Sequence, residues 1–238
     1  MSKGTLWGMI DAQPVYFPAV VNEMNAASLV FSVPTERART VVPEDAFDLV
    51  ESAPGTAPLV MAAHHYIQGG WGEGRTFDFG FRVRPAGAPD EPTGLLLHPS
   101  PMSPTFNREA AYRALGFPKT SGEVEVTYTD DTVTFTLAGD PEPEIMLRLP
   151  RARSDVAPAP VGIVAYTCVA GETKLAPFEL NTPIGIVDPG DVVLELGSGP
   201  LAGTLRLLGL PRAPDLALWG EGASAVFHAP RPAGGSGD

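Results

Sequence analysis

The chain has 238 residues, of which 44% are hydrophobic, and its 16 basic and 28 acidic side chains give a formal net charge of −12 at pH 7. This length suits a single domain with a sizeable core, and the negative charge argues against nucleic-acid binding, which depends on attraction to phosphates. No uninterrupted apolar run approaches the roughly 18 residues that cross a bilayer, and the single cysteine, Cys168, excludes an intramolecular disulfide and a cysteine zinc cage. We therefore expect a protein that binds neither nucleic acid nor membrane. Because no charged-then-apolar signal opens the sequence, we also expect a cytoplasmic one.

Glycine and proline contribute 26 residues each, scattered between short alternating apolar runs. That distribution favours a β-rich domain over disorder. We therefore predict one β-rich α+β domain over residues 1–231 and a flexible tail at 232–238.

The predicted elements follow from apolar periodicity and from glycine and proline boundaries. Residues 1–26 are expected to cover one side of the core. In chain order, the remaining predictions are a strand at 28–33, a helix at 36–40, strands at 58–67, 76–83 and 94–98, a helix from Ser103-Pro104 to Leu115, a hairpin at 123–129 and 132–137, strands at 144–149, 161–169, 174–180 and 191–196, a helix at 200–208 and a strand at 223–228.

Lys119 is the first candidate for chemistry. It follows Gly116-Phe117-Pro118 at the end of a predicted helix, where Gly116 fits a left-handed cap and Phe117 supplies an apolar wall. Burial of a lysine in such a place favours the neutral amine, which can attack a carbonyl carbon. The alternative is a lysine that points into water and complements the helix dipole.

Glu73 is the second candidate, in the glycine-rich turn at 69–74 beside Trp71. Glycines let the backbone approach a ligand closely, and an adjacent indole can raise the pKa of a carboxyl group for general acid–base work. The alternative is a solvated turn carboxylate.

The histidines do not predict a metal site. His64 and His65 are adjacent on a strand and point to opposite faces, so they cannot easily ligate one ion together with His98. We expect one buried, hydrogen-bonded histidine and one exposed one. The Gly197-Ser198-Gly199 segment before a helix lacks the lysine of a phosphate-binding loop, and Glu144 is expected to be a solvated loop acid.

The order of these motifs resembles the acetoacetate decarboxylase superfamily over about residues 14–230. Arg113-Ala-Leu-Gly116-Phe117-Pro118-Lys119 is similar to the family's Arg-Glu-x-x-aromatic-Pro-Lys run, in which the lysine forms a Schiff base. Gly70-Trp71-Gly72-Glu73, after Met61-Ala-Ala-His64, resembles the turn that brings an active-site glutamate into the pocket. Val41-Val42-Pro43 and Leu196-Gly-Ser-Gly-Pro200-Leu201 are supporting matches.

The resemblance implies a cone-shaped, mostly antiparallel β-barrel with a few surrounding helices and a closed apolar cavity, in a homo-oligomer whose reaction on a small molecule needs no external cofactor and no metal. It implies that Lys119 is the imine-forming nucleophile or a hydrogen-bond donor to the carbonyl, and that Glu73 is the general acid–base. The residues it implies in substrate contact are Trp71, Phe117, Met61 and Arg113.

Departures from the family pattern bear on the substrate. Thr120 replaces a second lysine, residues 20–33 contain no arginine to hold a substrate carboxylate, and Leu59 and Val60 stand where a strand glutamate is expected. Without that bidentate anchor, a small β-keto acid has little to hold it. We expect lyase-type aldol, dehydration or cyclisation chemistry on a larger, polyketide-like carbonyl compound of secondary metabolism, such as antibiotic biosynthesis. The alternatives are a cyclase that folds its substrate without a Schiff base and a non-catalytic small-molecule-binding barrel.

Overall fold

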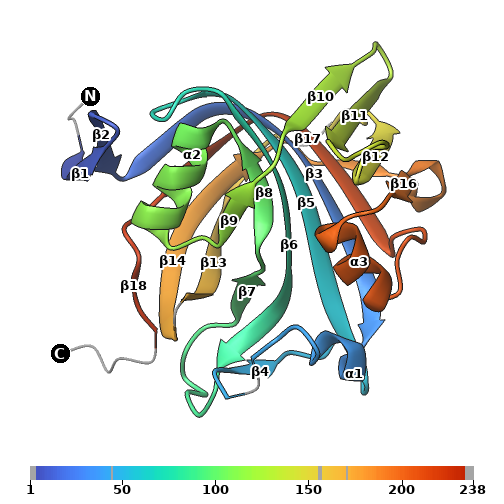
Figure 1. Ribbon diagram of the computed structural model, residues 1–238, viewed down its shortest axis with the longest axis horizontal. Helices are drawn as coiled ribbons and strands as arrows, with labels where there is room; N and C mark the ends of the chain where they lie inside the picture. The colour runs from blue at the N-terminus through green and yellow to red at the C-terminus, as the bar shows by residue number, and fades with distance from the viewer. Residues whose placement is uncertain (1–3, 44, 155–156, 170, 234–238) are drawn as a thin grey trace.

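A closed barrel forms the centre of the computed structural model, which describes residues 4–43, 45–154, 157–169 and 171–233 (Figure 1). The barrel strands are, in order around the ring, β17 (Leu216–Phe227), β3 (Ala19–Pro34), β5 (Thr56–Gly69), β6 (Gly74–Pro85), β7 (Gly94–Leu97), β13 (Ala159–Val169) and β14 (Glu172–Thr182). Pairing of β14 with β17 closes the ring, and all neighbouring barrel strands are antiparallel except β7 and β13. The prediction of a β-rich, mostly antiparallel barrel is confirmed.

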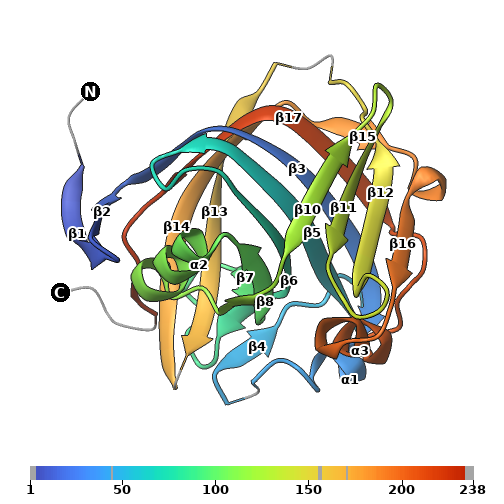
Figure 2. The same ribbon diagram turned by 45° about the horizontal axis from the view of Figure 1, so that its top comes forward.

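A second sheet covers one outer side of the barrel (Figure 2). Its strands are β10 (Val124–Tyr128), β11 (Thr132–Leu137), β12 (Ile145–Pro150) and β16 (Val193–Leu196). Phe135 of this sheet contacts Phe77 and Trp219 of the barrel, with ring centroids 6.2 and 6.3 Å apart. The main hydrophobic core therefore lies between the second sheet and the outside of the barrel, and the predicted hairpin is confirmed as β10 and β11.

Alternation along the strands separates this outer core from the inside of the barrel. Successive side chains of a strand point to opposite faces. On β6, Phe77 and Phe79 are buried in the outer core while Asp78 lines the inside. On β5, Met61 belongs to the outer core and His64 lines the inside.

The helices and short strands lie around the barrel. The helical segments are α1 (Thr35–Ala38), α2 (Thr105–Ala110), the π-helical turn η1 (Ala111–Leu115), the 3-10 turn η2 (Pro189–Asp191) and α3 (Pro200–Leu207). The short strands are β4 (Phe47–Leu49), β8 (Ser100–Ser103), β9 (Lys119–Ser121), β15 (Gly185–Val187) and β18 (Arg231–Pro232). None of the described helices is long and apolar enough to span a membrane.

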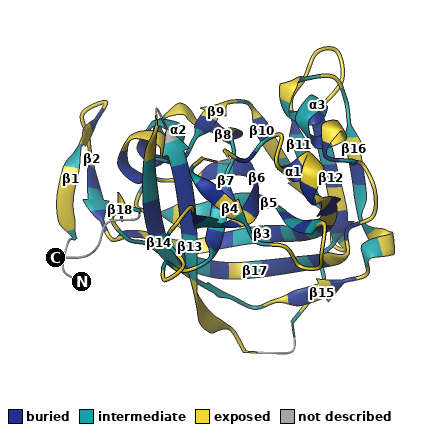
Figure 3. Cartoon of the chain, turned by 90° about the horizontal axis from the view of Figure 1, so that it is seen from below, coloured by how far each residue is buried: buried dark blue, intermediate teal, exposed yellow. Residues whose placement is uncertain are grey.

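The N-terminal segment contains a hairpin that the sequence did not predict, β1 (Thr5–Ile10) and β2 (Gln13–Phe17). Asp11 and Ala12 form its two-residue turn, with φ of 46° and 63°. Such a turn needs positive φ at both positions and is usually made by asparagine and glycine, so the usual sequence signal was missing. The hairpin stands at one end of the molecule with β1 largely exposed (Figure 3).

The predicted tail at 232–238 falls mostly outside the described residues. Of it, Pro232 pairs with Lys174 of β14, and residues 234–238 are not described.

Candidate active site

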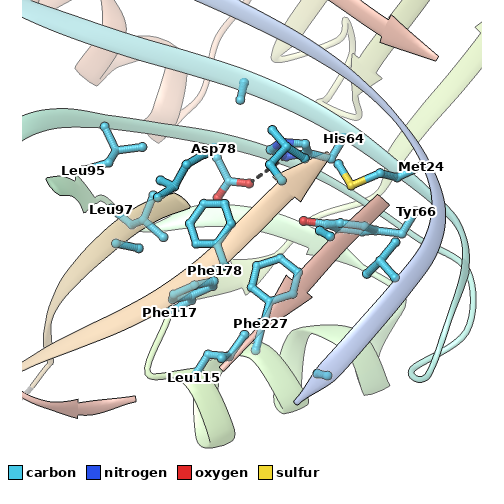
Figure 4. A pocket seen from close by; sticks show the side chains of 18 of the residues that line it. Met24, His64, Tyr66, Asp78, Leu95, Leu97, Leu115, Phe117, Phe178 and Phe227 are labelled. Carbon is cyan, nitrogen blue, oxygen red and sulfur yellow. Dashed lines mark ion pairs between the residues drawn. The ribbon is translucent and has the colours of Figure 1, made fainter. Parts of the chain in front are cut away.

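A cavity of about 390 Å³ lies inside the barrel (Figure 4). All of the barrel strands contribute to its wall, together with the turn at 69–74 and the helical segment α2 and η1. Most of the wall is apolar, as at Met24, Leu97 and Phe178. Its size and lining are those of a small-molecule site.

Lys119 lies in the cavity wall rather than in water. Its side chain is only 3% exposed, and Nζ donates hydrogen bonds to Thr76 Oγ1 at 2.8 Å, to Ser100 Oγ at 3.3 Å and to Asp78 Oδ1. A lysine ammonium has three N–H donors, so these three oxygens engage all of them. The alternative of a solvent-facing lysine is therefore wrong.

The end of the preceding helix places this lysine. Gly116 has a φ of 75° and its N donates to Tyr112 O at 3.1 Å, which is the hydrogen bond of a left-handed glycine cap, and Phe117 N donates to Ala111 O at 3.0 Å. Phe117 is buried against the helix and also lines the cavity. After Pro118 the chain enters β9, which runs parallel to β8 with Lys119 opposite Ser100. Local sequence therefore ends the helix, and strand pairing brings the amine to Ser100.

Asp78 is the carboxylate beside the amine. Its second oxygen, Oδ2, lies 3.3 Å from His64 Nδ1 (Figure 4). Burial by itself raises the pKa of Asp78, but the charge of Lys119 and the contact with His64 outweigh it and hold the pKa below its ordinary value. Asp78 is therefore a carboxylate at neutral pH, between an amine and an imidazole.

Tyr66 adds a hydroxyl group to the same wall. Its ring stacks on His64 with centroids 5.7 Å apart, and its side chain points into the cavity (Figure 4). Burial, and then the charge of Asp78, raise the pKa of Tyr66. The phenol therefore stays protonated at neutral pH and can donate a hydrogen bond to a bound molecule.

Glu73 does not face Lys119, which corrects the expected pairing of these two residues. Its side chain is 52% exposed, with Oε1 2.9 Å from His65 Nε2 and in contact with Arg75. The hydrogen bond with His65 and then the charge of Arg75 lower the pKa of Glu73, opposite to the expected rise. Asp78 occupies the position that the sequence analysis gave to Glu73.

The turn that carries Glu73 nevertheless forms part of the wall. Asn107 Nδ2 of α2 donates to Glu73 O at 3.2 Å, and a side chain at Gly74 would meet Asn107 within 2.4 Å. This close approach presents Trp71 to the cavity and leaves the Glu73 side chain outside it. The glycine-rich turn therefore positions the indole rather than the carboxylate.

Two of the four predicted substrate contacts lie away from the cavity. Trp71 and Phe117 line it. Met61 is 1% exposed in the outer core, because odd-numbered positions of this part of β5 point out of the barrel. Arg113 is exposed on η1 and does not line the cavity. The expected substrate contacts of Met61 and Arg113 are therefore corrected.

The adjacent histidines point to opposite faces, as predicted. His64 lines the cavity, whereas His65 Nδ1 lies 2.9 Å from Tyr128 Oη on the outer side. The expectation that one of them is exposed is wrong, since their side chains are 20% and 13% exposed. Within the described ranges, no three histidine, cysteine or acidic residues are placed to hold a metal ion.

Glu144 is a structural cap rather than a solvated loop acid. Its Oε1 accepts hydrogen bonds from Leu201 N at 2.6 Å and Ala202 N at 3.0 Å. A carboxylate therefore already occupies the start of α3. This explains the glycine-rich segment before α3 without a bound phosphate.

Arg82, like Asp78 and Tyr66, is a cavity residue that sequence reasoning missed. It lines the cavity from β6 at the same parity as Asp78. The alternation of Phe77, Phe79 and Phe81 against these polar positions was the available signal. It indicated one polar face of the strand but did not show that this face lines a cavity.

Comparisons with solved structures identify the fold. Acetoacetate decarboxylase from Legionella pneumophila has a TM-score of 0.68 and 13% identity, with 98% of each chain covered. An acetoacetate decarboxylase-like enzyme from Sphingomonas wittichii RW1 has a TM-score of 0.60 and 11% identity, with 96% of this chain and 99% of that chain covered. MppR, an enduracididine biosynthesis enzyme complexed with pyruvate, has a TM-score of 0.58 and 13% identity, with 92% and 91% covered.

No protein-family model matches the sequence, and no curated protein matches it. The similarity is therefore one of three-dimensional structure over nearly the whole chain. Together with a barrel cavity that holds a buried lysine, it shows that this chain has the fold of acetoacetate decarboxylase.

Proposed function

We propose that the protein is an enzyme that acts on a carbonyl-bearing small molecule in the barrel cavity, with Lys119 as the amine that forms an imine. The arrangement of Lys119, Asp78 and His64 carries this proposal. A nucleophile stands beside a base, and the base contacts a third group, which is the arrangement that activates a weak nucleophile. The largely apolar wall suits a substrate larger and less polar than a small keto acid, such as a polyketide-type compound.

Asp78 provides the proton transfers that imine formation requires. The Lys119 ammonium gives one proton to Asp78, and the free amine attacks the carbonyl carbon. The resulting carbinolamine loses its hydroxyl group as water, which takes up the proton held by Asp78 and leaves a protonated imine. Overall, an ammonium and a carbonyl compound give a protonated imine and one water. This step needs no further reactant.

The protonated imine then withdraws electrons from the adjacent carbon. A carbanion equivalent can form there by loss of a proton to Asp78 or by cleavage of a carbon–carbon bond. Tyr66 stays protonated and can donate a hydrogen bond to an oxygen of the substrate. Aldol, retro-aldol, dehydration and ring-closing reactions all use this intermediate, and we propose a lyase or cyclase of this kind.

One observation favours a second candidate, a cyclase without covalent catalysis. The three N–H donors of Lys119 are already engaged by Thr76, Asp78 and Ser100. An ammonium held in this way has no free donor but remains a fixed positive charge that attracts a carbonyl oxygen, while Phe178 and Phe227 line the wall against which an apolar chain can fold. In this candidate the shape of the cavity, and not an imine, promotes ring closure.

Reductive trapping separates the two candidates. The protein is incubated with 2-nonanone and cyanoborohydride, and the modified residue is located by peptide mass spectrometry. We expect the alkyl adduct at Lys119 in the unmodified protein and in Lys174→Arg. Lys174 is the control because its side chain is 42% exposed. We also expect slower trapping in Asp78→Asn.

Adduct formation at Lys174 but not at Lys119, under conditions where 2-nonanone raises the melting temperature, would refute imine chemistry. That result would support the non-covalent cyclase. Equal trapping rates for Asp78→Asn and the unmodified protein would remove Asp78 from the mechanism.

A further inference from the structure

We propose that Arg82 and Thr93 form a second subsite of the cavity, which binds an anionic oxygen group, carboxylate or phosphate, at the end of the substrate far from its carbonyl. The inference rests on the proposed function for the position of the carbonyl at Lys119. It names the substrate class as an elongated, apolar oxo compound with an acidic end.

The strand geometry sets the two polar ends apart. Asp78 and Arg82 are four residues apart on β6 and both line the cavity. A strand rises about 3.4 Å per residue, so their Cα atoms are about 14 Å apart along the strand. Asp78 is buried whereas Arg82 is exposed. The cavity therefore runs from a dry end at Lys119 to a solvent-facing end at Arg82.

The wall between these two ends is apolar. Leu95 lies opposite Arg82 in the strand register and lines the cavity. Leu97 and Val60 line it as well, on either side of β6. This apolar part of the wall offers no hydrogen-bond partners, and a hydrocarbon chain needs none, so such a chain can bind there.

Arg82 has unused hydrogen-bonding capacity. Its Nη2 donates to Thr93 Oγ1 at 3.2 Å, and a guanidinium has five N–H donors. Several other arginines have a carboxylate partner, namely Arg75, Arg108, Arg151, Arg212 and Arg231. Among the residues that the structure describes, no carboxylate pairs with Arg82.

The charge of the whole chain gives this unpaired guanidinium its significance. A protein with a net charge of −12 repels anions at long range. An anionic substrate is therefore retained only where a local cation is free to bind it. Arginine forms two parallel hydrogen bonds with a carboxylate or phosphate group, and Arg82 stands where such a group of a bound molecule would reach solvent.

The test compares matched ligands that differ only at the far end. The ligands are 9-oxodecanoic acid, its methyl ester and the corresponding 8-oxononyl phosphate, and the readout is the half-saturating concentration for reductive trapping at Lys119. We expect the acid or the phosphate to half-saturate at a concentration about tenfold lower than the ester, the scale of a charge-assisted hydrogen bond. The anion whose half-saturating concentration lies further below that of the ester identifies the group that the subsite prefers.

Variants locate the effect. Arg82→Gln is expected to raise the half-saturating concentration of the anions about tenfold and to leave that of the ester unchanged. Arg113→Gln is the control, because Arg113 is exposed outside the cavity, and it should change neither. Equal values for acid, phosphate and ester in the unmodified protein, or an unchanged gap in Arg82→Gln, would overturn the subsite.

A separate binding measurement keeps this inference distinct from the imine. The shift in melting temperature caused by each ligand is recorded for the same proteins. A larger shift with the anions that disappears in Arg82→Gln, in the absence of any trapping at Lys119, would support the subsite and reject the imine. Trapping at Lys119 that does not depend on Arg82 would support the imine and reject the subsite.

Discussion

The ion pair of Lys119 and Asp78 makes a sharp prediction about stability. Their side chains are 3% and 12% exposed, so water cannot readily solvate either charge when its partner is removed. Breaking a buried pair from one side costs about 3–5 kcal/mol. Asp78→Asn leaves Thr76 and Ser100 as acceptors for the Lys119 amine, so we expect the low end of this range, about 3 kcal/mol. In a chain of this length, that loss lowers the melting temperature by about 6–12 °C.

A double-mutant cycle measures the interaction directly. Lys119→Met and Asp78→Asn are made singly and together, and the free energy of unfolding in urea is determined at pH 7. Lys119→Met leaves the Asp78 carboxylate buried without a cation beside Oδ1, where only the Ser100 hydroxyl still donates at 3.2 Å, and with His64 at Oδ2, so it should also destabilise. The double variant leaves no charge of the pair unbalanced, and we expect it to lose about 2–3 kcal/mol less than the sum of the single variants.

The pH dependence gives an independent check of the same pair. The pKa of Asp78 in the folded protein lies below its ordinary value of 3.8, so the unfolded chain takes up this proton first as the pH falls. The contribution of Asp78 to stability is therefore complete well above pH 4 and is lost progressively below it. The stability gap between the unmodified protein and Asp78→Asn should shrink in that range. In the double-mutant cycle, single variants that each lose less than about 1 kcal/mol, with effects that simply add, would behave like a solvent-exposed pair and would refute the burial of this amine.

Two further predictions concern residues outside the cavity. Burial lowers the pKa of His98 to about 4, and its ring stacks on that of Phe79 with centroids 5.1 Å apart. As the pH falls, the unfolded chain therefore protonates this imidazole before the folded protein does. The free energy of unfolding should drop by up to about 3 kcal/mol between pH 6.5 and pH 4 because of His98 alone. His98→Phe should therefore flatten the melting temperature over this range, and parallel pH profiles of the two proteins would contradict the buried, neutral state. Glu144→Ala removes the acceptor at the start of α3 and should destabilise by about 1 kcal/mol in urea, whereas a loss no larger than that of the exposed control Glu142→Ala would show that the cap contributes nothing.

Sequence reasoning located the barrel strands, the helix that ends at Gly116 and the lysine that follows it. These features have local signals. A period of two marks β6, a glycine in the left-handed region marks the helix end, and proline restricts the residues after it. The N-terminal hairpin was missed because Asp11 and Ala12 make a tight turn without the usual residues.

The partner of the lysine was not available from local signals. Glu73 and Asp78 are both acidic, and in the sequence both lie in or within a few residues of the glycine-rich turn at 69–74. The register of β6 and the parallel pairing of β8 with β9 decide that Asp78 faces Lys119, while His65 and Arg75 hold Glu73 outside. The same register decides that Met61 is a core residue and that Arg82 is a cavity residue.

Local patterns in the sequence were enough to predict the strand-rich architecture and the place of Lys119 directly after a helix cap, because alternation, helix caps and turns depend on residues that are neighbours in the chain. The three-dimensional arrangement was needed to show that this amine is buried, which carboxylate contacts it and which arginine reaches the cavity. These outcomes depend on how strands far apart in sequence align, and a one-residue shift in that alignment turns every side chain of a strand to the opposite face.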